Sequence, residues 1–160
     1  MERMIKVGGK PYKIRASAGA LVIYKAQFGK DYPDELAELG DDNKKAFVVG
    51  CRLLWAMARA AKAKLPTPDE WINSFRDKEL AAALIVSQQL FAFSVGDSEG
   101  RGSEKFSSEK LMASAALCGM GPSDLNSLPL GMVIDTIEEY AQIRCGEGGE
   151  YVSAAEFFGE

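Results

Sequence analysis

The stretch DNKKAFVVGCRLLWAMA, residues 42–58, decides the fold. Its apolar residues recur at i, i+4, i+7, i+8 and i+11, which is the spacing of one face of an α-helix, and they are Phe47, Cys51, Leu54, Trp55 and Ala58. Asp41 or Asp42 stands where an N-cap is needed. The sequence therefore predicts a long amphipathic helix here, with a mainly α-helical fold around it.

Two helices are predicted before this stretch. Ser17 can cap the first, whose Leu21, Tyr24 and Phe28 follow helical spacing and whose C′ residue is Gly29. A short second helix opens at the Asp-Tyr-Pro sequence of residues 31–33 and ends at Gly40.

Two more helices are predicted immediately after it. Thr67, Pro68 and Glu70 form the pattern of a capping box before Trp71. The helix that follows, from about residue 77 to residue 95, is rich in alanine. Its expected inward residues are Leu80, Leu84, Phe91 and Val95, whereas Gln88 and Gln89 point more outward.

Near the N-terminus the period changes from helical to alternating. Ile5 and Val7, then Tyr12 and Ile14, alternate with polar residues around Gly8-Gly9. Two adjacent glycines can supply the positive φ angles of a type I′ turn. The sequence predicts a small β-hairpin, whose second strand presents its outer edge to solvent or a partner at Pro11, because proline has no N–H to donate.

The composition of the chain changes at residues 96–107, where glycine, serine and charged residues dominate and a flexible linker is expected. Residues 1–95 would then form a module of hairpin and helices, and residues 108–145 a small C-terminal helical module. In the latter, Ser108 caps a helix through Leu111, Met112, Ala115 and Cys118. A short helix near residues 123–128 precedes a long one with Leu130, Val133, Ile134, Ile137 and Ala141 inward. Residues 146–160 form a tail that we expect to be poorly ordered.

Charge and composition exclude several classes of function. The chain has 160 residues, a formal net charge of −4 and a pI near 5.0, which argues against a general binder of nucleic acid. No apolar run is long enough for a membrane span, and the first residues do not resemble a signal peptide. Three cysteines without C-x-x-C spacing are typical of reduced thiols, so we expect a cytoplasmic protein.

The chain contains no histidine. This excludes Ser-His and Cys-His nucleophile pairs and the usual histidine metal sites. Asp135, Glu138 and Glu139 lie close together on the last predicted helix, but a solvated helix face explains them. We therefore predict no enzyme, no cofactor and no metal; a site of carboxylates or lysine remains the enzymatic alternative.

Four residues are candidates for binding another protein. Met57 lies off the main apolar stripe, and flexible methionines suit surfaces that accept varied helices. Trp71 belongs either to the core or to an exposed docking patch. Phe157 and Phe158 lie in the tail.

Several segments, taken in order, carry a resemblance to a known family. They are residues 5–15 (IKVGGKPYKIR), 24–31 (YKAQFGKD), 53–58 (LLWAMA), 68–72 (PDEWI), 116–121 (ALCGMG) and 128–135 (LPLGMVID), with Glu138-Glu-Tyr140. They resemble the tail assembly chaperones of long-tailed phages and prophages of Gram-positive bacteria.

The resemblance implies a protein that binds the tape-measure protein and recruits tail tube subunits during tail assembly, in the cytoplasm of the host. It leaves self-association open. The alternative is a structural tail or connector component of the virion, in which the exposed hairpin would offer a sheet edge for ring formation.

Overall fold

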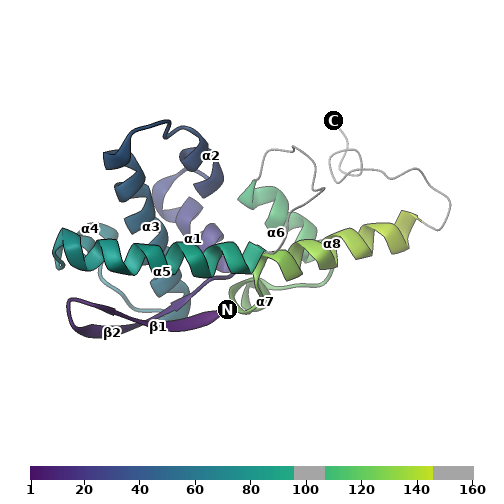
Figure 1. The fold of residues 1–160 in the computed structure, drawn as a ribbon. Coiled ribbons are helices and arrows are strands. Elements are labelled where there is room, and N and C mark those ends of the chain that lie inside the picture. Colours follow the sequence, from purple (N-terminus) through teal and green to yellow (C-terminus); the bar gives the residue numbers. More distant parts are fainter. Residues whose placement is uncertain (96–106, 146–160) are drawn as a thin grey trace.

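The computed structural model describes residues 1–95 and 107–145, and of these the side chains of residues 93–95 and 145 are not described. The chain opens with an antiparallel hairpin of β1 (Glu2–Val7) and β2 (Lys10–Arg15), followed by helices α1 to α8 (Figure 1). The expected mainly helical fold with a small N-terminal hairpin is confirmed.

The hairpin turns at Gly8 and Gly9, whose φ angles of 57° and 76° fit the predicted type I′ turn. Lys6 faces Pro11 across the two strands, while Met1 and Ala16 exchange both backbone hydrogen bonds, at 2.9 and 2.8 Å. Since bonded and non-bonded pairs alternate in an antiparallel ladder, Pro11 occupies a non-bonded pair. Its missing N–H therefore costs the ladder nothing.

The first two helices are α1 (Ala18–Phe28) and α2 (Tyr32–Ala37). Gly29 ends α1 with a φ of 75°, as predicted. Ser17 occupies the N-cap position, but its side chain makes no capping hydrogen bond and its Oγ is buried without a partner. Glu38 ends α2, before the expected Gly40.

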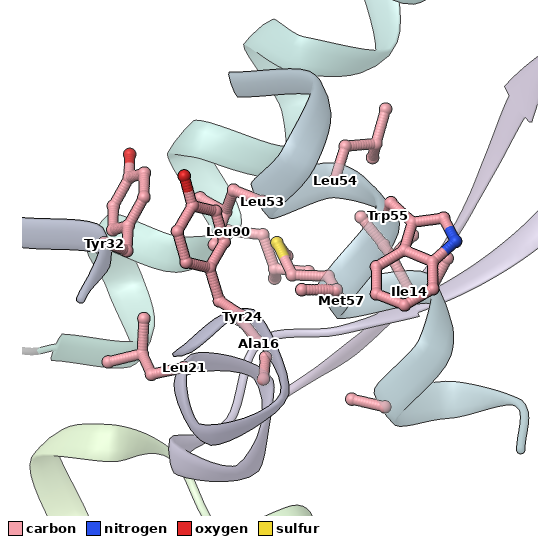
Figure 2. Close-up of a cluster of buried hydrophobic side chains, with 14 of the residues drawn as sticks. Ile14, Ala16, Leu21, Tyr24, Tyr32, Leu53, Leu54, Trp55, Met57 and Leu90 are labelled. Carbon is pink, nitrogen blue, oxygen red and sulfur yellow. The ribbon is translucent and has the colours of Figure 1, made fainter. Parts of the chain in front are cut away.

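The helix predicted from residues 42–58 is α3 (Asn43–Ala61), the centre of the molecule. Asp42 caps it by accepting hydrogen bonds from the backbone N–H groups of Lys44 and Lys45, both at 3.1 Å. The helix packs against β2 and against α1, α2, α4 and α5. Figure 2 shows the result: side chains of α3 meet those of the hairpin, α1, α2 and α5 in one apolar cluster.

The predicted capping box opens α4 (Pro68–Asn73), where Thr67 Oγ1 accepts from the backbone N–H of Glu70 and the Glu70 carboxylate accepts from that of Thr67. The next helix, α5 (Asp77–Val95), has the predicted bounds. Leu80 and Leu84 are buried, and Gln88 and Gln89 are exposed, as expected.

The last three helices are α6 (Ser108–Leu117), α7 (Pro122–Ser127) and α8 (Leu130–Cys145). Ser107, and not Ser108, caps α6: its Oγ accepts from the Lys110 N–H at 3.4 Å. Ser107 is the last residue of the expected linker, so this residue belongs to the cap of α6 instead. On α8, Leu130 and Val133 are buried, whereas the expected inward residues Ile134, Ile137 and Ala141 are half-buried, because α8 extends beyond the rest of the described chain (Figure 1).

Helices α6 to α8 contact the first part of the chain directly. Asp31 accepts hydrogen bonds from both the N–H, at 3.1 Å, and the Oγ of Ser108. Asn126 Nδ2 donates to the carbonyl of Ala60 at 3.1 Å, and the Asn126 carbonyl accepts from Arg15 at 3.3 Å. The segments predicted as two modules thus contribute to a single cluster of buried apolar residues. Residues 96–106 and the tail 146–160 lie outside the described chain.

Candidate protein-binding surface

The solvent-facing side of α5 is uncharged in the described part of the helix that follows Glu79. No acidic or basic residue occurs between Glu79 and Asp97. The exposed residues of this helix after Glu79 are Ala81, Ala82, Ile85, Gln88, Gln89 and Ala92, and we call them the α5 face. Figure 1 shows α5 crossing the near side of the molecule with no described element in front of it. Uncharged helical surface of this kind marks a place where another protein could pack.

The spacing of the α5 face suits contact with another helix. Ala81, Ile85, Gln88 and Ala92 recur at intervals of four, three and four residues, as the a and d positions of a heptad do. Ile85 is 61% exposed and is the largest apolar side chain of the set. Alanine allows close approach of a second helix, and the glutamines can both donate and accept hydrogen bonds.

The other side of α5 is fixed in the core. Leu80, Ala83, Leu84, Ser87 and Leu90 are buried there, and Ser87 Oγ donates to the carbonyl of Leu84 at 2.9 Å. Helix α3 comes close enough at Gly50 that a Cβ added there would lie 3.2 Å from Leu84 Cδ2. The α5 face is therefore presented by a packed helix and not by a loop.

Two of the four predicted binding residues lie in the core instead of on the surface. Met57 has an exposed fraction of 0%, so its interpretation as a surface residue is wrong (Figure 2). Helical spacing predicts one buried face for α3, but neighbours surround this helix on several sides. Trp71 is 2% exposed and packs edge-on against Tyr12 and Phe75, which is the core alternative. Phe157 and Phe158 lie outside the described residues.

The sequence contained the signal for the α5 face. The sequence predicts the outward position of Gln88 and Gln89, and it has no charged residue between Glu79 and Asp97. Outward-facing positions of a soluble helix normally carry charged or polar groups. On α5 several of these positions carry alanine or isoleucine instead.

Two titratable groups in the core, Cys51 and Tyr24, have raised pKa values. Burial raises the pKa of the Cys51 thiol to about 11, with a smaller contribution from Asp77, so the thiol stays protonated at neutral pH. Burial and the hydrogen bond to Glu35 raise the pKa of Tyr24 well above its ordinary value. Glu35 also pairs with Arg52 at 2.6 Å, which completes a network linking α1, α2 and α3.

The acidic residues of α8 lie at the surface or are partly buried. Asp135 and Glu139 are exposed and Glu138 is half-buried, in agreement with a solvated face. Across residues 1–95 and 107–145, no group of three or more cysteine, aspartate or glutamate side chains is arranged to hold a metal ion. In the same residues no helix is long and apolar enough to cross a membrane.

Comparison of the chain with protein-family models, with curated proteins and with solved structures finds no match.

Proposed function

We propose that this protein is a tail assembly chaperone of a long-tailed phage or prophage, which binds helical segments of the tape-measure protein and recruits tail tube subunits. It would act in the cytoplasm of the bacterial host and catalyse no reaction. The observation that carries the proposal is the α5 face, an uncharged, exposed helix surface with heptad spacing.

The chemistry of this surface suits a client that must be released. An amphipathic helix could lie along α5 with its apolar stripe against Ile85 and the alanines, in the manner of helix-in-groove recognition. Full burial of one isoleucine side chain contributes about 1.5–3 kcal/mol, and alanines contribute less. Contacts of this size give weak, reversible binding to each segment, and many segments along a long client would be covered together.

The proposed client is inferred from the segments that resemble the chaperone family. In the structure they form the hairpin, α1, α3, α4 and the region from α6 to α8, in that order. The resemblance is one of short apolar and aromatic segments, and the α5 face adds a surface on which a helix could bind.

The test is co-expression with a helical fragment of the tape-measure protein encoded by the same genome. We expect the fragment to stay soluble with the wild-type chain and to precipitate with Ile85→Glu, because the α5 face would then bury an unpaired carboxylate on binding. Val48→Glu on α3 is the matched control, since Val48 is also an exposed apolar residue on a helix. Circular dichroism should show both variants folded. Equal precipitation with and without the wild-type chain would refute the proposal.

A structural component of the tail is the second candidate, and the free edge of β1 favours it. Since bonded pairs alternate along the hairpin, the backbone groups of Glu2, Met4 and Lys6 point away from β2 and could pair with another strand. Mass spectrometry of purified particles separates the two candidates. Stoichiometric presence in mature virions would favour the structural component, whereas absence supports the chaperone.

A further inference from the structure

Helix α6 has an uncharged outer side. The sequence holds no charged residue between Lys110 and Asp124. Met112 is 39% exposed and Leu117 is 52% exposed, and the alanines beside them are exposed as well. These four residues form two pairs with a spacing of four residues, so they lie next to each other on successive turns. We call them the α6 face, and they are Met112, Ala113, Ala116 and Leu117.

The opposite side of α6 is packed against the rest of the described chain. Leu111, Ser114 and Ala115 are buried there. The first turn is held by the hydrogen bonds from Ser108 to Asp31, and the helix contacts α1 and α8. Figure 1 shows α6 at the edge of the described chain, beside α8. The α6 face is therefore presented by a fixed helix at the periphery.

Residues 146–160, which follow α8 in the chain, have a composition that complements the α6 face. All of their charged side chains are glutamates. The α6 face begins next to the exposed Lys110, whereas Glu109, the one acidic residue of α6, pairs with Lys25 at 3.5 Å. Methionine sulfur also makes favourable contacts with aromatic rings. The large apolar side chains of the tail are Tyr151, Val152, Phe157 and Phe158.

The tail starts close enough to α6 to reach it. Helix α8 has 16 residues and spans roughly 24 Å, and α6 contacts it. The twelve residues from Gly146 to Phe157 span at most roughly 40 Å, which reaches the α6 face with length to spare. The α5 face is harder to reach, because Ile85 lies roughly 15 Å before the end of α5 from which α8 extends (Figure 1).

We propose that residues 151–158 cover the α6 face of the same molecule, with the rings of Phe157 and Phe158 against Met112. The three glycines within residues 146–149 accept the backbone angles that a return towards α6 needs. A tethered segment has an effective concentration on the order of 1 mM at a nearby site, so even a weak contact keeps the face covered. The inference does not depend on the proposed client.

Nuclear magnetic resonance of the methionine methyl groups in the full-length chain tests this proposal. An aromatic ring shifts the resonance of a methyl group packed against it, and leucine does not. Replacing Phe157→Leu and Phe158→Leu together should therefore shift the Met112 resonance. Met4 on the hairpin and Met57 in the core are the internal references, and their resonances should move several times less. The shift should be the same at all protein concentrations, because the contact lies within one molecule.

A second variant tests the same contact from the side of α6. Leu117→Glu removes an apolar partner and brings a carboxylate against the acidic tail, so chymotrypsin should cleave after Phe157 or Phe158 about tenfold faster than in the wild type. Ile85→Glu is the matched control, since Ile85 is also an exposed apolar residue on a helix, and its cleavage should equal that of the wild type.

Four outcomes would overturn the proposal. The first is a Met112 resonance that does not respond to the loss of the two rings, and the second is a larger response at Met4, which would place the tail on the hairpin. The third is a shift that vanishes on dilution, because the tail would then belong to a second copy. The fourth is equal cleavage of Leu117→Glu and the wild type.

Discussion

Asp31 is a buried carboxylate that connects the first part of the chain to α6. Besides the two hydrogen bonds from Ser108, it accepts one from Lys25 Nζ at 3.0 Å. Burial acts to raise the pKa of Asp31, but the hydrogen bonds from Ser108 and Lys25 outweigh it and hold the pKa below its usual value. The ionised form is therefore the one that the fold stabilises.

The pH dependence of stability follows from the direction of this shift. Because the pKa of Asp31 is lower in the folded state, its contribution is complete above the unfolded pKa of about 3.9 and is lost as the pH falls through the folded pKa. We expect Asp31→Asn to lower the free energy of unfolding strongly at pH 7 and less at pH 3, which lies below the unfolded pKa. Urea titrations at both pH values measure this. An equal loss at both would show that charge at Asp31 is irrelevant.

At the scale of elements, the contact between α1 and α7 depends on Gly19. A Cβ added at Gly19 would lie 2.8 Å from Asn126 Cα, which is a backbone atom and cannot yield unless α7 moves. We expect Gly19→Ala to lower the free energy of unfolding by about 1–3 kcal/mol through overpacking. This loss should appear although alanine is the better helix former.

Gly50→Ala is the control for this prediction. The Cβ of alanine at Gly50 would meet methyl groups of Leu84, which can shift by a small rotation of the side chain. We expect the gain in helix propensity to offset that adjustment, so that urea denaturation finds a stability close to the wild type. If both glycine variants lost the same stability, the backbone contact with α7 would not be the cause.

The described elements could be predicted from the sequence because their signals are local. The Gly8-Gly9 turn, the Asp42 cap and the Thr67 capping box each depend on residues a few positions apart, and all three are present. Burial depends on contacts between elements that are distant in sequence. The sequence therefore predicts the burial of side chains less well than it predicts the elements. Met57 is buried by neighbouring elements, which helical spacing does not reveal. Ser108 donates a hydrogen bond to Asp31, a residue that is distant in sequence.

For the molecule as a whole, the shared core predicts that α6 to α8 and the first part of the chain unfold together. Leu125 of α7 is buried in the same cluster as Trp55 and Trp71. We expect Leu125→Ala to lower the free energy of unfolding by about 2–5 kcal/mol. Both tryptophans lie before residue 96, so their fluorescence reports on the first part of the chain. Helix α7 lies in the later part.

Two spectroscopic probes of the same urea unfolding transition test whether the two parts of the chain unfold together. Tryptophan fluorescence and far-ultraviolet circular dichroism should give one transition in urea, and Leu125→Ala should move both by the same amount. Two separate transitions, with the fluorescence midpoint unchanged by Leu125→Ala, would instead support the two independent modules that the sequence suggests.

The protonated thiol of Cys51 gives access to the kinetics of the core. Alkylating reagents react with thiolates, and at pH 8 a pKa of about 11 leaves roughly one thiol in a thousand ionised, at a position that solvent does not reach. Alkylation of Cys51 therefore requires α3 to separate from its neighbours. In a chain with Cys118→Ser and Cys145→Ser, the rate of alkylation would measure how often the centre of the molecule opens to water.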